Sequence, residues 1–407
     1  MRREAGVRGK ESDCDGAMRV LAVSHAAILS INRPFWTELA RRGHRVCLIV
    51  PTRWRNDYGS RPLQPEPLAD SAGGLLSLQP CRAAMPGSTA LQCYTPAAVA
   101  RLAAWRPDII FIDEEPWSLA TLQWTALAAA LRRPVALRTE ENRRRTFPWP
   151  FSLLHKTVLT RAAGIAAVSE MGAQVLRDHG YGGVTAVLPH AVDTQLFCPA
   201  LPDQRPGGAL PRIGFVGRIV PPKGIETLLD AAALLTERSG RSAAIFALYG
   251  AGAPAYLEGL RDRQRHLGLG NDTVVWHGPV AHHDVPQAMQ SLDLLVVPTV
   301  SHRGYKEQFG RVVIEALACK VPVLTSDNGE LPVLVARTGG GFVTPEGQPR
   351  ALAEQITAAL ADRSALAARA EAGYQYVLRH YTYGTLAQEA EGFLRRLVGD
   401  AAATTQE

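Results

Sequence analysis

The chain has 407 residues, of which 46% are hydrophobic and 20% are charged, and this composition excludes an intrinsically disordered chain, a collagen-like repeat and a small disulfide scaffold. The length favours two or more domains. Of the net charge of +6, residues 18–205 carry +7 (21 Lys and Arg against 14 Asp and Glu), residues 206–407 carry −1 (19 against 20), and residues 1–17 cancel. The basic half suits an anionic partner, namely a phosphorylated ligand, a membrane surface or nucleic acid, or it reflects a general arginine bias.

The N-terminal segment is expected to be a flexible leader, residues 1–17, because Met18 opens the first apolar strand. It has no apolar stretch of the kind found in secretory signals, and no window of eighteen apolar residues occurs anywhere in the chain. The six cysteines are far apart and form no C-x-x-C pair. Reduced thiols and a cytoplasmic protein are therefore expected.

Apolar runs alternate with helical patterns from Met18 onward, as in βαβ units. Helices are expected at 33–42, 117–132 and 151–162. Strands are expected at 19–24, 45–50, 108–113, 134–139, 164–169 and 185–190, and again at 212–217, 243–250, 273–278, 294–299 and 321–326. Because these strands are continuously apolar, the pattern predicts parallel sheets covered on both faces.

A Pro- and Gly-rich stretch, 201–211, separates the two series and is predicted to be an interdomain linker. The predicted fold class is therefore α/β, with two doubly wound, Rossmann-like domains at 18–200 and 212–381 that face each other across a ligand cleft. A C-terminal helix, 382–399, is expected to cross back to the first domain before a short tail, 400–407.

Two motifs in the second domain suit a phosphorylated ligand. In G-F-V-G-R-I-V-P-P-K-G, Gly217 follows a strand, and Arg218 and Lys223 lie beside the start of a helix. Two cations beside a helix N-terminus suit a diphosphate, although a solvated Arg and a first-turn Lys would look the same. A second glycine turn at Gly250 follows the next strand and is a weak signal alone.

The most informative stretch is Y-K-E-Q-F-G-R-V-V-I-E-A-L-A, in which Glu307 precedes a helix that contains Glu315. The backbone N–H groups of Gly310, Arg311 and Val312 at the helix start suit a phosphate. A nucleotide sugar fits this layout, with sugar hydroxyls on Glu307 and ribose hydroxyls on Glu315. The alternative is an amphipathic helix with two solvated glutamates.

The ordered set of V-G-R-x4-K-G, G-x-G-x-P, H-G-x-V, D-L-L-V-V-P, E-Q-F-G-R-V-V-I-E-A and S-D-N-G-E-L-P resembles glycosyltransferase family 4. The resemblance covers the whole second domain and, more loosely, the first. It implies the GT-B fold and a retaining, nucleotide-sugar-dependent glycosyltransferase. The variants K-E-Q-F-G-R and E-E-P-W-S-L are similar to those of bacterial polysaccharide glycosyltransferases in this family.

Carried over by position, the resemblance implies that Arg218 and Lys223 contact the donor diphosphate, Glu307 the donor sugar and Glu315 the ribose. These contacts make Arg218, Lys223 and Glu307 the expected catalytic residues. The remaining donor residues implied by the resemblance are Gly217, Gly250, Phe309, Gly310, Arg311 and Val312, with His277 and Val280 in the base pocket. No His, Asp or Cys cluster has metal-ligand spacing, so neither a metal nor another cofactor is expected.

The first domain departs from the family pattern on the acceptor side. His25 and Asn32 replace a glycine pair, and R-T-E-E-N lacks a His that several members have, so that Glu140 or Asn142 could take its place. Among the three carboxylates of D-E-E-P-W-S-L, Glu115 is the candidate to accept a proton from an acceptor hydroxyl. The alternative is that these acids merely enrich a helix N-terminus.

The stretch 142–156 mixes four cations with three aromatic residues. It suits docking on the anionic inner face of the plasma membrane or a solvated loop, and suits single-stranded nucleic acid least, because no nucleic-acid module accompanies it. The expected function is transfer of a hexosyl group from a nucleotide sugar to a glycan or lipid-linked acceptor in polysaccharide or glycoconjugate synthesis. A nucleotide-sugar epimerase and a non-catalytic nucleotide-sugar-binding protein are the alternatives.

Overall fold

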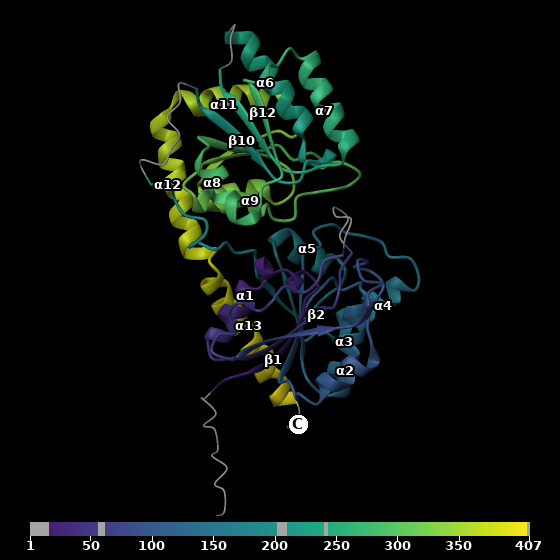
Figure 1. Cartoon of the computed structure of the whole chain (residues 1–407). Helices are drawn as coiled ribbons and strands as arrows, with labels where there is room; N and C mark the ends of the chain where they lie inside the picture. Colours follow the sequence, from purple (N-terminus) through teal and green to yellow (C-terminus); the bar gives the residue numbers. More distant parts are fainter. Residues whose placement is uncertain (1–15, 56–61, 202–209, 240–242, 405–407) are drawn as a thin grey trace, which may run out of the picture. The chain divides into compact units, whose positions relative to one another are not determined.

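The computed structural model describes residues 16–55, 62–201, 210–239 and 243–404. Most of the predicted leader and of the predicted linker lies outside these ranges. The chain divides into two compact units: residues 1–138, 146–165 and 387–407 form the first, and residues 139–145 and 166–386 form the second. Figure 1 shows helices on both sides of the strands in each unit.

The first sheet has seven strands in the order β3-β2-β1-β6-β7-β8-β9, and the neighbours whose register is known pair in parallel. Its strands are β1 (Arg19–Val23), β2 (Arg45–Pro51), β3 (Leu76–Cys81), β6 (Ile109–Asp113), β7 (Val135–Thr139), β8 (Gly164–Ala167) and β9 (Val184–Val187). The associated helices are α1 (Pro34–Arg41), α2 (Pro96–Ala103), α3 (Leu119–Ala130), α4 (Phe151–Arg161) and α5 (Glu170–Asp178). A two-stranded sheet joins β4 (Ala83–Ala84) to β5 (Cys93–Tyr94).

The second sheet has six parallel strands in the order β12-β11-β10-β13-β14-β15. These are β10 (Arg212–Val216), β11 (Ile245–Tyr249), β12 (Val274–Gly278), β13 (Leu294–Val297), β14 (Val323–Ser326) and β15 (Gly341–Thr344). The helices that follow them are α6 (Ile225–Ser239), α7 (Pro254–His266), α8 (Val285–Gln290), α9 (Arg311–Ala318), α10 (Leu331–Thr338), α11 (Pro349–Ala361) and α12 (Arg363–His380). The last helix, α13 (Tyr383–Thr404), places its residues from Ala387 onward in the first unit.

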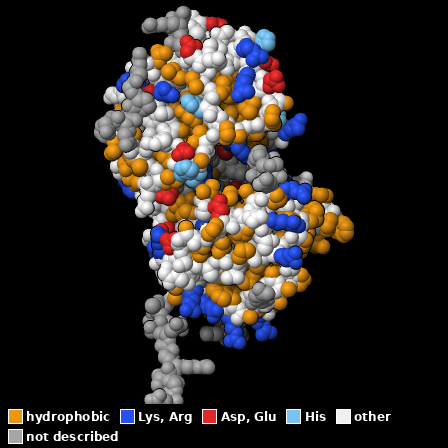
Figure 2. All heavy atoms as spheres, viewed as in Figure 1, with side chains coloured by type: hydrophobic (Ala, Val, Ile, Leu, Met, Phe, Trp, Pro, Cys, Tyr) orange, Lys and Arg blue, Asp and Glu red, His pale blue; other side chains and the backbone are white. Residues whose placement is uncertain are grey.

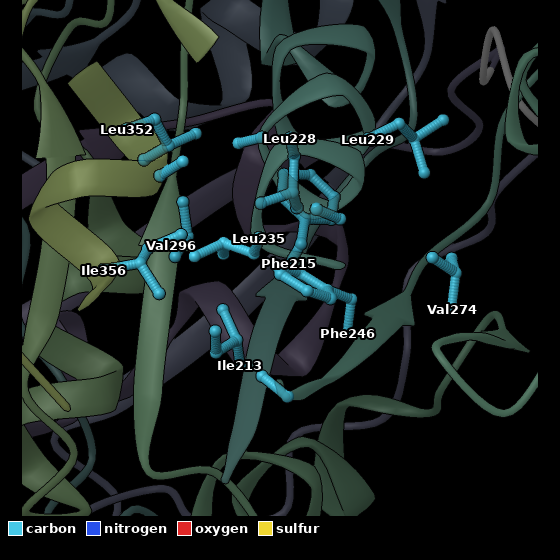
Figure 3. Close-up of a cluster of buried hydrophobic side chains, with 14 of the residues drawn as sticks. Ile213, Phe215, Leu228, Leu229, Leu235, Phe246, Val274, Val296, Leu352 and Ile356 are labelled. Atoms are coloured by element: carbon cyan, nitrogen blue, oxygen red, sulfur yellow. The ribbon is translucent and has the colours of Figure 1, made fainter. Parts of the chain in front are cut away.

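Two hydrophobic cores cover the two faces of the second sheet. Alternate residues of one strand contribute to different cores, so that Leu294 and Val296 of β13 belong to one and Leu295 and Val297 to the other. Figure 3 shows the first core, in which Phe215 and Phe246 of the sheet meet Leu228 and other helical side chains. Burial on both faces explains why a central strand such as β13, L-L-V-V, is apolar at every position, and it confirms the predicted parallel α/β architecture.

The predicted strands all form, with ends that differ by up to three residues, but four further strands were not predicted. Two of them are β4 and β5 of the two-stranded sheet, and the other two are β3 and β15, which lie at one edge of each large sheet. The β3 sequence, L-S-L-Q-P-C, is only partly buried, and β15, G-F-V-T, begins with a Gly and has a half-buried Phe342 and an exposed Val343. An edge strand is less covered than a central one, so it lacks the continuous apolar run on which the prediction relied.

None of the described helices has the length and apolar content that a segment needs to cross a membrane. The cysteines in the described ranges form no disulfide bond. Figure 2 shows Lys and Arg side chains gathered at the lower end of the first unit, which agrees with the basic balance of residues 18–205.

Candidate functional site

The second sheet changes its direction of winding between β10 and β13, which are neighbours in space but not in sequence. Ligands of doubly wound folds bind beyond the carboxyl ends of the strands at such a point. Gly217 and Arg218 follow β10 directly, and the loop after β13 leads to Glu307. Gly217 N–H donates to the Tyr249 carbonyl at 3.0 Å, which fixes the chain as it leaves the strand.

Lys223 and Glu307 form an ion pair at this position. Lys223 closes a short 3-10 turn, Pro221–Lys223, and its Nζ lies 2.5 Å from Glu307 Oε2 and 3.3 Å from the Tyr305 hydroxyl. The two charged side chains are only 17% and 11% exposed. Burial is the largest single influence and acts to lower the pKa of Lys223, but the charges and hydrogen bonds of Glu307 and Tyr305 together outweigh it, and the pKa is raised above its ordinary value. Lys223 is therefore a cation throughout the physiological range.

Glu307 is held by hydrogen bonds to its backbone as well as its side chain. Its N–H donates to Asn328 Oδ1 at 2.9 Å, while its carbonyl accepts from Asn142 Nδ2 at 2.9 Å and from Glu330 N–H at 3.1 Å. The Thr299 hydroxyl donates to Glu307 Oε2 at 3.1 Å. This set of partners leaves the carboxylate little freedom to rotate, as a site that orients a ligand requires.

Helix α9 begins immediately after this loop. Gly310 occupies its N-cap position with φ +87°, and a Cβ there would lie 2.6 Å from Leu331 Cδ2, so the position favours glycine on both counts. Glu315 lies inside the helix, with its carboxylate 3.2 Å from Arg311 Nε. Burial raises the pKa of Glu315 to about 7, although the Arg311 charge opposes the shift.

A pocket of about 270 Å³ in the second unit brings together most of the predicted donor residues. Its lining includes Gly217, Arg218, Lys223, Glu307, Phe309, Gly310, Arg311 and Val312, together with Glu140. Arg218 is exposed, whereas Phe309 is buried at 4% exposure. Residues that lie 84 positions apart in sequence thus share one cavity that contains three cations and the N-terminus of a helix.

Two further lining residues, Tyr305 and His190, were not predicted. Tyr305 contacts both members of the ion pair, and its hydroxyl donates to Glu307 Oε1 at 3.3 Å. His190 Nε2 lies 3.2 Å from Glu140 Oε1, and its ring meets the edge of Phe309. The position of His190 shortly after a strand was a usable signal, but the sequence analysis missed it.

Gly250, His277 and Val280 lie at or beyond the ends of the neighbouring strands β11 and β12, and none of them is among the residues that line this pocket. Gly250 N–H donates to the Gly278 carbonyl at 2.8 Å. The His277 ring stacks on Tyr249, with centroids 4.2 Å apart, and Val280 packs against the core of that sheet face. Glu315 and Asn142 also stay outside the pocket lining and reach it through Arg311 and Glu307.

The first sheet has a corresponding change of winding between β1 and β6. His25 follows β1, and its Nδ1 lies 2.6 Å from Glu114 Oε2, while its backbone N–H donates to Glu114 Oε1 at 2.7 Å. The imidazole stacks on Trp54 at 4.3 Å, and Glu114 is 5% exposed. A buried carboxylate that fixes one imidazole nitrogen favours a single tautomer of the ring.

Asn32 and Glu115 have a different environment from the one expected. The Asn32 amide donates to the Ala26 carbonyl at 2.8 Å and so ties its own loop together. Glu115 accepts a hydrogen bond from Thr121 through its backbone carbonyl. The acids do not occupy the first turn of a helix, because α3 starts at Leu119 and Ser118 caps it. In this loop Glu114, rather than Glu115, pairs with the histidine.

The buried carboxyl group of Glu315 should make stability depend on pH. Its pKa is about 7 in the folded chain and near 4.5 in the unfolded chain, so its contribution to stability is complete below pH 4.5 and is lost as pH rises through 7. We expect the wild type to lose about 3 kcal/mol of unfolding free energy over this range relative to Glu315→Gln. Urea denaturation of both proteins at several pH values measures the difference, and parallel profiles would contradict the assignment.

Metal ligands were not expected, and among the described residues no three His, Cys, Asp or Glu side chains come together in a way that could hold an ion. The D-C-D triplet at 13–15, which imitates the D-x-D metal motif of some sugar transferases, lies outside those residues.

Two family models match most of the chain. Residues 204–376 match "Glycosyl transferases group 1", and residues 33–191 match "Glycosyl transferase 4-like domain". A relative from Mycobacterium tuberculosis, named as a GDP-mannose-dependent alpha-(1-6)-phosphatidylinositol monomannoside mannosyltransferase, is 30% identical over 224 residues, which cover 53% of this chain and 56% of that protein. The chain thus matches about half the length of its curated relatives.

Solved structures share the fold. HepE of Anabaena, solved in complex with UDP, superposes with a TM-score of 0.71 at 19% identity and covers 93% of this chain and 100% of its own. Sucrose-phosphate synthase of Thermosynechococcus elongatus superposes with a TM-score of 0.72 at 20% identity and covers 94% and 100%. Together with the two parallel sheets, these matches identify the predicted GT-B fold.

Proposed function

The chain belongs to glycosyltransferase family 4, and from this membership we propose that it transfers a hexosyl group from a nucleoside diphosphate sugar to a hydroxyl of a glycan or lipid-linked acceptor. The proposed reaction retains the anomeric configuration and serves polysaccharide or glycoconjugate synthesis in the cytoplasm. The relative's name gives GDP-mannose and the HepE structure contains UDP, so guanosine and uridine are the first bases to test.

The observation that carries the proposal is the pocket that combines Arg218, Lys223 and the start of α9 with the fixed carboxylate of Glu307. Two cations and a helix N-terminus are complementary to a diphosphate. A carboxylate with hydrogen-bonded backbone and side chain is suited to orient sugar hydroxyls. Glu315, inside the same helix, is assigned to the ribose, and the stacked pair of Tyr249 and His277 to the side of the base.

In the proposed reaction the acceptor oxygen forms a bond to the anomeric carbon on the face from which the diphosphate leaves. The bond between that carbon and the phosphate oxygen breaks, and the acceptor proton passes to the departing phosphate. Negative charge grows on the β-phosphate, and Arg218 and Lys223 stabilise it most where the site is shielded from water. No separate glycosyl nucleophile is assigned.

We assign this charge stabilisation to the protein cations without a metal ion. Unchanged transfer after exhaustive chelation is the expected result, and restoration of a lost activity by a divalent cation would contradict it.

For the acceptor we propose the end of the first sheet, where Glu114 holds His25. The imidazole is 25% exposed and stacks on Trp54, and such an arrangement can hydrogen-bond a sugar hydroxyl. Glu140 with His190, and Asn142 through its bond to the Glu307 carbonyl, are assigned to positioning the transferred sugar.

Arg218→Ala should weaken binding of the preferred nucleoside diphosphate roughly tenfold or more, because a charged hydrogen bond contributes about 1.5 to 3 kcal/mol. Arg218 is exposed, so its loss should leave the fold intact. Calorimetric titration of UDP, GDP and ADP into the wild type and the variant measures the change. Arg265→Ala in α7, whose partner Asp262 lies on the protein surface, is the matched control.

Product analysis with the preferred donor separates the alternatives. Transfer of sugar to an added glycan or lipid-linked acceptor supports the proposal. Conversion of one nucleotide sugar into another without an acceptor supports an epimerase, and tight binding without turnover supports a non-catalytic protein. Equal affinity of the wild type and Arg218→Ala would show that the diphosphate does not bind in this pocket.

A further inference from the structure

Trp149 and Leu153 are strongly exposed hydrophobic residues of the first unit, with exposures of 81% and 60%. Trp149 immediately precedes the N-cap of α4, and Leu153 lies in the first turn of that helix. The opposite side of α4 is buried through Leu154, Val158 and Leu159. Figure 2 shows hydrophobic side chains gathered at the right-hand edge of the first unit, where Figure 1 places α4, with Lys and Arg side chains near them.

In the basic and aromatic stretch 142–156, some side chains contact other parts of the protein and others face outward. Phe147 packs beside Trp117 and His155. Arg143 donates to the Gly304 carbonyl at 2.7 Å, and Arg145 pairs with Glu141 at 2.5 Å. Phe147, Arg143 and Arg145 therefore contact other parts of the protein, so the stretch 142–156 does not form one continuous basic and aromatic surface.

Two exposed cations belong to α4. Lys156 lies three residues after Leu153, so it is on the same side of the helix, and Arg161 ends the helix. Both are exposed, and neither forms an ion pair among the described residues. The sequence from Asn142 to Ser169 contains five Lys and Arg residues and no Asp or Glu. Helix α3, which packs against α4, also contains no Asp or Glu.

We propose that Trp149, Leu153, Lys156 and Arg161, together called the α4 surface, dock the chain onto an anionic lipid bilayer. The Trp indole is suited to the headgroup region and the Leu side chain to the acyl boundary. The two cations meet lipid phosphates, and no carboxylate on α3 or α4 repels them. Nucleic acid fits less well, because single strands need several stacking aromatics along a basic groove, whereas this surface has one outward aromatic.

The test is sedimentation of the full chain with vesicles of phosphatidylcholine and phosphatidylglycerol in equal parts, compared with phosphatidylcholine alone. The wild type should bind the anionic vesicles and bind the neutral ones much more weakly. Trp149→Ser/Leu153→Ser and Lys156→Glu/Arg161→Glu should each reduce binding roughly tenfold or more, from the loss of apolar insertion and of cation attraction. Brominated acyl chains should quench the tryptophan emission of the wild type more than that of Trp149→Phe.

The controls match the variants in exposure and charge. Met85→Ser removes a side chain that is 57% exposed on the same unit, and Arg41→Glu/Arg42→Glu makes the same change of charge at the end of α1. Both should keep vesicle binding, and all variants should keep nucleoside diphosphate binding, since the proposal is independent of the transfer reaction. Equal loss in control and α4 variants, no vesicle binding by the wild type, or binding of single-stranded oligonucleotides in place of vesicles would overturn it.

Discussion

Lys223→Met should lower the free energy of unfolding by about 3 to 5 kcal/mol, and adding Glu307→Gln should restore most of the loss. The single change leaves the Glu307 carboxylate, 11% exposed, without the cation 2.5 Å away. Removing both charges leaves no buried ion behind. Urea denaturation of the wild type, Lys223→Met, Glu307→Gln and the double variant forms a double-mutant cycle, in which the coupling energy between the two residues should be large.

The surface pair of Arg263 and Asp230 is the matched control in the same unit. It is bidentate, with distances of 2.8 and 2.7 Å, but its side chains are 44% and 24% exposed. Because solvent screens such a pair, Arg263→Met should change stability by less than about 1 kcal/mol. If Arg263→Met and Lys223→Met lower the free energy of unfolding by similar amounts, burial does not strengthen the Lys223 pair.

The same four proteins separate folding from function. The double variant should be folded yet should bind nucleoside diphosphates much less tightly than the wild type, because the phosphate loses Lys223. If the double variant binds and transfers normally, the ion pair serves only to stabilise the fold, and the proposed donor site is wrong.

Gly329→Ala should destabilise the chain by about 3 kcal/mol or more and abolish donor binding. Gly329 has φ +59°, and a Cβ would lie 2.2 Å from the Glu307 carbonyl oxygen and 2.7 Å from its nitrogen. Its neighbours Asn328 and Glu330 both hydrogen-bond the Glu307 backbone. The clash is with backbone atoms, so no side-chain rotation relieves it, and Glu307 must move.

Gly347→Ala provides the control for backbone strain alone. Gly347 has φ +68°, and the nearest atom to its Cβ would be Val300 Cγ1 at 4.0 Å. We expect only the left-handed penalty of about 1 to 2 kcal/mol and normal donor binding. Equal destabilisation of the two variants, measured by urea denaturation, would show that contact with Glu307 does not matter.

The fold was predictable where burial acts on every residue of a strand. The β13 segment, L-L-V-V, faces a hydrophobic core on each side, and its unbroken apolar run reveals this directly. Edge strands such as β3 lack that cover, and their mixed sequences resemble loops. The ends of α1, α3 and α4 were predictable to within about two residues, since the caps are local in sequence, whereas α13 extends to Thr404, five residues beyond its predicted end.

The candidate site was predictable only in part. Arg218, Lys223 and Glu307 were proposed from motif order, and the structure brings them to one pocket. Tyr305 stands beside the Glu307 motif and His190 follows a strand, but neither position by itself shows that the side chain lines the pocket. Glu115 was chosen from three neighbouring carboxylates, but the turn after β6 directs Glu114 to His25.

The sequence alone determined the alternation of strands and helices, the division into two α/β parts and the family motifs, because each of these is written in neighbouring residues. Only the tertiary structure decided that Glu307 pairs with Lys223, that Asn328 and Asn142 fix its backbone, and that Trp149 faces outward while Phe147 packs inward. These contacts join residues far apart in sequence or depend on the path of the loop that precedes α4. Local pattern does not encode such contacts, since they follow from how whole elements pack.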